Sequence, residues 1–181
     1  NIYLILNGMI KTLIFIHGWA SSPDIWKGQK EYFSKDFEVV LPDISRSKDI
    51  KEAAAIIGES VSGREDFVYI GWSLGFLAAL ELLKNPGNKP KGLVSVNSTP
   101  KFVDDGYLGA GPTLSHLLKM IRDLRKDPEK TLEGFYRQLL SDAGSQMLSE
   151  FNFKSLDFDY LIYGLEMLKA AYSKSDEPLI Y

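Results

Sequence analysis

Short apolar runs alternate with helix-like stretches through the first half of the chain, and this alternation constrains the fold more than any other feature. Strands joined by a tight turn pair antiparallel, whereas parallel strands need a longer crossover that usually holds a helix. The sequence therefore predicts an α/β fold with a mostly parallel sheet. We expect strands at Ile2–Leu6, Thr12–Ile16, Phe37–Leu41, Phe67–Gly71 and Gly92–Val96, and helices that begin at Pro23 or span Lys51–Ser60 and Gly75–Lys84.

The pattern changes after Pro100, where apolar residues keep helical spacing and strand-like runs disappear. Asp127-Pro128 combines a helix cap with proline and separates two of the predicted helices. We predict a core over 1–100, a helical lid over 101–175 that covers the carboxyl edge of the sheet, and the start of a returning strand at 176–181. The positions with helical spacing are Leu114, Leu117, Leu118, Ile121 and Leu124; Leu132, Phe135, Tyr136, Leu139 and Leu140; and Leu161, Leu165, Leu168 and Tyr172.

Bulk composition narrows the classes of function. The 181 residues, 45% hydrophobic and 25% charged, fit one globular domain. A formal net charge of -3 gives no reason to expect nucleic acid as a partner. The absence of cysteine excludes a disulfide framework and a thiolate metal site, and it fits a reducing cytoplasm. No apolar run approaches the roughly 18 residues that a membrane span requires.

Gly71-Trp72-Ser73-Leu74-Gly75 joins a predicted strand directly to a predicted helix. A serine nucleophile occupies such a turn in strained backbone geometry at the edge of a sheet, and flanking glycines leave room for neighbouring backbone. The helix N-terminus also directs N–H groups toward a developing oxyanion. The motif predicts Ser73 as a nucleophile; the alternative is a glycine-flanked serine that only starts a helix.

His17-Gly18-Trp19 follows the predicted strand Thr12–Ile16 and is the second candidate element of a site. In a fold of this kind, the loop at that place supplies the second oxyanion donor. The two donors are then the backbone N–H groups of Leu74 and Trp19. His17 could be read as a catalytic base, but we predict that it braces the loop, because the base is expected after the last strands.

Other polar residues allow two interpretations each. Asp43 ends a strand at the carboxyl edge, where it either orients a base or, as we favour, forms a turn. His116 is either a displaced base or a surface residue, and we favour the surface because no acid lies near it in a fixed register. One face of a predicted lid helix is basic, and composition alone favours a solvated surface there: Lys119, Arg122 and Lys126, with Arg125 and Arg137 nearby.

Aromatic residues adjoin both candidate motifs. Trp26 is predicted to be a core residue. For Trp19 and Trp72, a place in the wall of a pocket and a place in the core are equally supported. We assign Trp19, Trp72 and the lid residue Phe135 to substrate binding.

Five segments of the chain together match the pattern of a known family: His17-Gly18-Trp19, Trp26, Gly71–Gly75, Ser98-Thr99-Pro100 and Gly164-Leu165-Glu166-Met167-Leu168-Lys169. They resemble the esterases that hydrolyse pimeloyl-acyl-carrier-protein methyl ester in biotin synthesis, and the resemblance runs from about Lys11 to Tyr181. It implies an α/β-hydrolase fold with a helical lid and a serine carboxylesterase that needs no metal or organic cofactor. It also implies Ser73 as nucleophile, Trp19 and Leu74 as oxyanion donors, and contact of Arg122, Arg125 and Arg137 with an acidic acyl carrier protein.

The sequence departs from this family in two places. Pro42–Ser47 stands where such hydrolases usually carry a glycine-rich turn. The family's acid and histidine, and its last core strands, would follow Tyr181, so we expect a truncated or partial version of a longer protein. Two alternatives stay open: a binding module that holds an acyl carrier protein without turnover, and another chemistry on the same serine, such as a lactonase or thioesterase.

Overall fold

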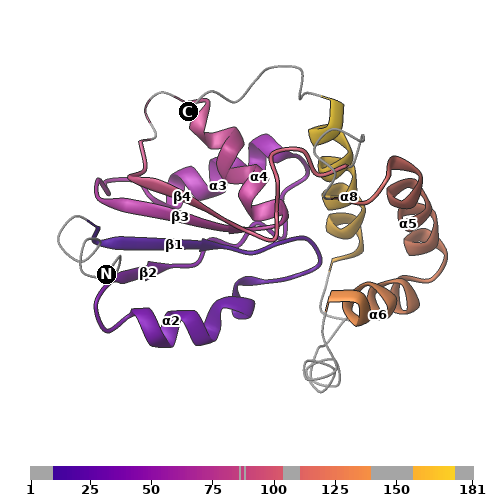
Figure 1. Ribbon diagram of the computed structural model, residues 1–181, viewed down its shortest axis with the longest axis horizontal. Coiled ribbons are helices and arrows are strands. Elements are labelled where there is room, and N and C mark those ends of the chain that lie inside the picture. Colours follow the sequence, from indigo (N-terminus) through magenta and orange to yellow (C-terminus); the bar gives the residue numbers. More distant parts are fainter. Residues whose placement is uncertain (1–9, 86, 88, 104–110, 140–156, 174–181) are drawn as a thin grey trace.

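The computed structural model describes residues 10–85, 87, 89–103, 111–139 and 157–173 (Figure 1). The predicted strand Ile2–Leu6 and the predicted start of a returning strand at 176–181 lie outside these ranges.

The described residues form a parallel sheet of four strands. Its order is β2-β1-β3-β4, and all three pairings are parallel. Each strand falls within a residue of its predicted position, because each is an apolar run bounded by turn residues. The strands are β1 (Thr12–Ile16), β2 (Glu38–Val40), β3 (Phe67–Trp72) and β4 (Gly92–Val96).

Helices cover both faces of the sheet (Figure 1). On one face, Leu13 and Phe15 of β1 pack into a cluster with Trp26, as predicted for that residue. On the other face, Ile14 and Ile16 pack into a second cluster with residues of the helices that span 50–60 and 74–83. This alternation follows from the two-residue period of a strand. The covering helices are the short 3₁₀ helix η1 (Pro23–Trp26) and α2 (Lys27–Phe33) on the first side, and α3 (Ile50–Ser60) and α4 (Leu74–Leu83) on the second.

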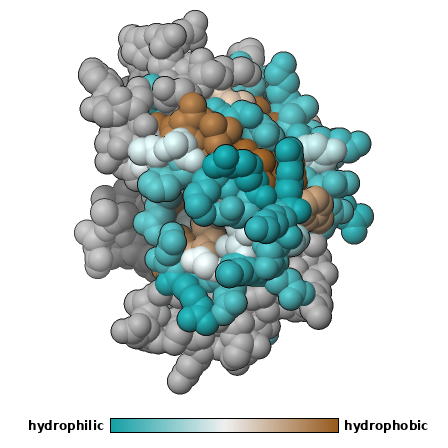
Figure 2. All heavy atoms as spheres, turned by 90° about the vertical axis from the view of Figure 1, so that its right-hand side faces the viewer, coloured by the Kyte–Doolittle hydropathy of each residue, from teal (hydrophilic) through white to brown (hydrophobic). Residues whose placement is uncertain are grey.

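Three further helices lie together beyond one end of the sheet, at the right in Figure 1. They are α5 (Leu114–Lys126), α6 (Pro128–Leu139) and α8 (Phe158–Ser173). As predicted, α6 begins at Pro128, and the Asp127 carboxylate accepts a hydrogen bond from the Lys130 N–H at 3.1 Å. Figure 2 looks onto this end, where hydrophilic residues dominate and hydrophobic residues show between them. Among helices of the described ranges, none has the length and apolar character of a bilayer crossing.

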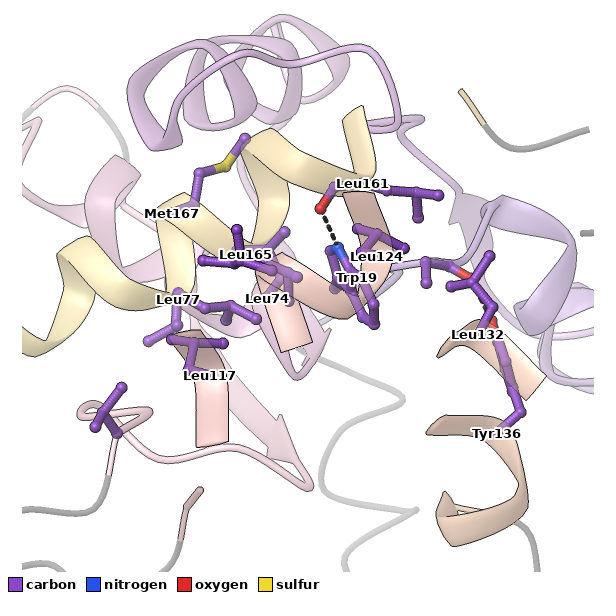
Figure 3. Close-up of a cluster of buried hydrophobic side chains, with 14 of the residues drawn as sticks. Trp19, Leu74, Leu77, Leu117, Leu124, Leu132, Tyr136, Leu161, Leu165 and Met167 are labelled. Atoms are coloured by element: carbon purple, nitrogen blue, oxygen red, sulfur yellow. Dashed lines mark hydrogen bonds between the residues drawn. The ribbon is translucent and has the colours of Figure 1, made fainter. Parts of the chain in front are cut away.

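A third apolar cluster joins these helices to the core (Figure 3). Leu74 and Leu77 of α4 meet Leu117 of α5, Leu132 of α6 and Leu165 of α8, and each of the five is 5% exposed or less. The apolar stripe that the sequence predicts on each helix therefore packs against the first turns of α4 rather than facing solvent.

The strand order reverses between β1 and β3. The chain leaves β1 to form β2 on one side, and β3 then returns to the other side of β1. In open parallel sheets, a crevice forms beyond the carboxyl ends of the two strands at such a reversal, and ligands bind there. The two segments that follow β1 and β3 are His17-Gly18-Trp19 and Ser73, so the topology brings both predicted motifs to one place.

Two glycines permit this arrangement, and replacing either of them should lower the stability of the fold. A Cβ on Gly75 would lie 2.5 Å from the Ile16 carbonyl oxygen and 2.6 Å from that of His17, and a Cβ on Gly71 would overlap Phe76 backbone. We expect Gly75→Ala and Gly71→Ala each to lower the free energy of unfolding by about 2–4 kcal/mol.

Gly28→Ala is the matched control, since a Cβ there meets nothing within 4 Å. It should be neutral or stabilising by up to about 1 kcal/mol, because alanine has the higher helix propensity. Urea unfolding of the three variants measures both effects. Equal stability of Gly75→Ala and Gly28→Ala would contradict the close approach of α4 to β1.

Candidate active site

Ser73 occupies the strained turn between β3 and α4. Its backbone has φ 51° and ψ -117°, a conformation that a residue with a Cβ rarely adopts. Its hydroxyl does not cap α4, so the side chain is not used by the helix that it precedes. Leu74 is the first residue of that helix, and its N–H therefore has no acceptor within the helix.

The end of β4 holds this turn in place. The Ser73 N–H donates to the Val96 carbonyl at 3.1 Å, and the Ser98 hydroxyl donates to the Ser73 carbonyl at 3.1 Å. Both bonds constrain the backbone of Ser73, and neither involves its side-chain hydroxyl. Ser98 belongs to the Ser98-Thr99-Pro100 segment of the family resemblance, and this bond gives that segment a physical role.

The segment His17–Ser21, here called the β1 loop, packs against the turn. A Cβ on Gly18 would lie 3.0 Å from the Trp72 ring and 3.2 Å from the Ser73 Cβ, so glycine is needed for this approach. Trp19 and Ala20 are buried, and Ala20 has the positive φ of 54°. The backbone of Trp19, the predicted second oxyanion donor, therefore lies on a loop in contact with the turn at Ser73.

His17 braces the β1 loop from the core. Its ring is completely buried, with Nδ1 3.0 Å from the Gly18 carbonyl oxygen and Nε2 accepting the Ile44 N–H at 3.1 Å. An N–H can only donate, so the Ile44 bond requires an unprotonated Nε2 and places the ring proton on Nδ1. Both ring nitrogens are thus engaged by backbone, as expected of a structural residue.

Asp43 lies beside the same ring. One carboxylate oxygen is 3.4 Å from His17 Nε2 and accepts the Ser45 N–H at 2.9 Å. An ion pair between these two groups would need a protonated Nε2, which excludes the Ile44 bond; we assign the Ile44 bond because it is the shorter. The Ser45 bond forms the turn that we predict at Asp43.

Lid residues contact the β1 loop directly. The Trp19 indole N–H donates to the Leu161 carbonyl of α8 at 2.8 Å, a bond drawn in Figure 3. The ring of Phe135 meets that of Trp19 edge-on, with centroids 4.8 Å apart. The Tyr136 hydroxyl of α6 donates to the Ala20 carbonyl. The loop is therefore enclosed between the sheet and the helices α6 and α8.

A cavity of about 880 Å³ opens between this loop and the lid helices. Ser73, Trp19, Trp72 and Phe135 all line it, so the structure brings the predicted nucleophile together with the three predicted substrate-binding residues. Its size is within the range of small-molecule sites. The remaining wall is mixed. It includes the apolar residues Phe102, Met120, Leu165 and Leu168, and it also includes charged residues, among them Asp123 and Asp127.

Some lining residues were missed by sequence reasoning. Asn97 lines the cavity with a positive φ of 45°, directly after β4. Its position at the carboxyl end of a parallel strand is a signal that could have identified it. Met120 and Leu168 carry no such signal, because an apolar residue at helical spacing is equally suited to a core.

The predicted carrier-protein contacts lie outside the cavity wall. Arg122, Arg125 and Arg137 are exposed, and Arg137 pairs with Glu133 at 2.6 Å within α6. The basic residues that do line the cavity are Lys119, Lys126 and Lys130. Lys119 pairs with Asp123, whereas Lys126 and Lys130 have no carboxylate partner within 4 Å among the described residues. The carrier role of the three arginines stays a prediction.

His116 is exposed at the cavity wall, and its Nδ1 lies 3.1 Å from the Thr113 hydroxyl at the start of α5. Neither His116 nor His17 hydrogen-bonds to the Ser73 hydroxyl in the part of the chain that the structure describes.

Comparison with solved structures identifies the fold. An esterase from Exiguobacterium antarcticum superposes with a TM-score of 0.77 at 18% identity, over 88% of this chain and 66% of that one. The chain therefore has the α/β-hydrolase fold, as predicted. This fold carries many chemistries, so the likeness by itself defines no reaction.

Curated relatives confirm the predicted resemblance in sequence. Pimeloyl-acyl-carrier-protein methyl ester esterase of Nitrosomonas europaea is 29% identical over 154 residues, which cover 81% of this chain and 60% of that protein. The protein of the same name from Aromatoleum aromaticum is 29% identical over 76% of this chain and 59% of its own length. The chain thus spans about three fifths of the length of these relatives. No protein-family profile matches the chain.

The two histidines should respond differently to replacement. His17→Ala removes a buried ring and leaves the Ile44 N–H unpaired, so we expect the free energy of unfolding to fall by about 2–4 kcal/mol. His116→Ala should change it by less than about 0.5 kcal/mol, because that side chain is exposed. Denaturant titration of both variants checks the contrast, and comparable losses would show that His17 is no brace.

Proposed function

We propose that this chain is the nucleophile-bearing part of a serine carboxylesterase that hydrolyses a methyl ester of an acyl group held on an acyl carrier protein. The observation that carries the proposal is Ser73, held at φ 51° on the wall of a cavity and in contact with the β1 loop. Backbone strain of this kind is maintained at functional sites by the surrounding structure. The names of the relatives above support the substrate class of this proposal.

The geometry supports the following chemistry. The Ser73 hydroxyl attacks the ester carbonyl, and its proton passes to a base that lies outside the described residues. The N–H groups of Leu74 and Trp19 stabilise the oxyanion of the tetrahedral intermediate. Methanol leaves with the proton returned by the base. Water then attacks the acyl-enzyme, the acid is released, and Ser73 regains its proton.

The cavity supports an acyl chain with a polar anchor. The apolar part of its wall suits methylene groups, whose burial contributes about 0.8 kcal/mol each. Lys126 ends α5 and Lys130 lies in the first turn of α6, so two cations stand beside the apolar wall. A phosphopantetheine arm carries one phosphate between the carrier protein and the acyl group. These lysines are the cations that such a phosphate would meet at the cavity.

The nucleophile is tested on the full-length protein by activity-based labelling. We expect a fluorophosphonate probe to label Ser73 alone, and Ser73→Ala to lose both labelling and hydrolysis of an acyl methyl ester. Turnover should fall by several orders of magnitude, because nucleophile and base act as a unit. Ser98→Ala should retain labelling, although its bond to the turn is lost. Undiminished labelling of Ser73→Ala would refute the proposed nucleophile.

The carrier-protein substrate is tested by charge reversal. We expect Lys126→Glu/Lys130→Glu and Arg122→Glu/Arg125→Glu each to weaken carrier-protein binding several-fold, since one exposed ion pair contributes only ~0.2–1 kcal/mol. Rising salt should weaken binding of the parent, through screening over about 8 Å at physiological ionic strength. Turnover of a free small ester should barely change in the arginine variant.

Lys27→Glu/Lys30→Glu is the matched control, because it makes the same change in charge on α2, which covers a face of the sheet. Affinity is measured by titration at low and high salt. If all three double variants bind the carrier protein as the parent does, the basic residues are solvated surface and a small-ester hydrolase is the better assignment.

A further inference from the structure

The β1 loop is held by the lid as well as by the core. Two buried hydrogen bonds reach it across long sequence separations: the Trp19 indole N–H donates to Leu161 of α8 at 2.8 Å, and Tyr136 of α6 donates to Ala20. Trp19 itself makes the first bond and its neighbour Ala20 accepts the second, and the backbone N–H of Trp19 is the proposed second oxyanion donor. The two helices thus contact the residues on which that donor depends.

Gly164 completes the contact with α8. A Cβ at this position would overlap Trp19 Cδ1, so only glycine allows the ring to lie against the helix with its N–H directed at Leu161 (Figure 3). Gly164 is buried, and it begins the Gly-Leu-Glu-Met-Leu-Lys segment of the family resemblance. A side chain here would displace either the helix or the indole.

The bond from Tyr136 is equally specific. The residue is 4% exposed, and burial raises the pKa of its phenol, so the hydroxyl stays a donor throughout the neutral range. Its acceptor, Ala20, has a positive φ, which a residue with a Cβ adopts only where its surroundings hold it. The bond from α6 therefore supports a strained position of the loop.

From these contacts we propose that helices α6 and α8 position the oxyanion donor, with Tyr136 and Gly164 as positioning residues, so that the site is competent only while both helices are docked. The inference rests on the proposed function and goes beyond it. A lid that only covered the cavity would affect substrate entry. A lid that also sets the Trp19 N–H affects stabilisation of the transition state, which appears in kcat rather than in KM.

The structure offers matched controls. Tyr160 of α8 is buried like Tyr136, but its hydroxyl has no hydrogen-bond partner among the described residues. Tyr160→Phe removes the same atom as Tyr136→Phe but breaks no hydrogen bond to the β1 loop among the described residues. Gly28→Ala adds a methyl group to a helix at an open site, whereas Gly164→Ala adds it against Trp19.

The experiment uses the full-length protein and three measurements: kcat and KM for an acyl methyl ester, the affinity for an alkyl boronic acid, and hydrogen–deuterium exchange of residues 17–21. A boronic acid forms a tetrahedral adduct with a serine and so reports on the oxyanion site. We expect Tyr136→Phe and Gly164→Ala to lower kcat about tenfold, less than the 10²–10³ for loss of a whole donor. KM should stay within twofold, boronic acid affinity should fall in parallel with kcat, and exchange should rise.

Tyr160→Phe and Gly28→Ala should match the parent in all three measurements. The proposal is overturned if Tyr136→Phe, correctly folded, keeps the parent's kcat, boronic acid affinity and exchange, or if Tyr160→Phe loses as much as Tyr136→Phe. A parent protein with neither turnover nor boronic acid binding would instead refute the proposed function. The exchange measurement then still decides whether α6 and α8 hold the loop.

Discussion

The close approach of helix α4 to the end of strand β1 is the contact on which the rest of the structure depends. Gly75 lies against the Ile16 and His17 carbonyls, and Gly71 lies against the backbone of Phe76. A turn this tight holds Ser73 at positive φ, and its hydroxyl does not cap the helix that it precedes. The same approach sets the β1 loop against the turn, so one packing constraint brings both motifs together.

Polar interactions from the core and from the lid both hold the residues around this contact. His17 and the end of β4 fix the loop and the turn from the side of the sheet, through bonds to Ile44, Val96 and Ser98. The lid helices add the apolar cluster around Leu74 and the bonds to Trp19 and Ala20. Because these groups are buried, loss of any one bond leaves a polar group without a partner and lowers the stability of the folded state. This favours a single arrangement of the loop.

Much of this could be predicted from the sequence, because the decisive signals are local. Apolar runs and glycine spacing located the strands and the turn at Ser73, and Asp127-Pro128 located the boundary between α5 and α6. Contacts between distant segments have no such signal. Nothing in the sequence indicates that Tyr136 donates to Ala20, or that Lys130, rather than Arg122, lines the cavity. Helical spacing shows which residues share a face, but the neighbour of that face is set by tertiary packing.

The bonds between the β1 loop and the lid also bear on the order of folding. Ala20 and Tyr136 are 116 residues apart, and Trp19 and Leu161 are 142 residues apart. Closing such long loops is slow compared with local pairing, since chain entropy must be lost before the contact forms. During synthesis, β1 to β4 emerge before α8, so the strained serine turn can assemble on a sheet whose β1 loop still lacks its Leu161 acceptor. The β1 loop therefore reaches its described arrangement only after α8 has been synthesised.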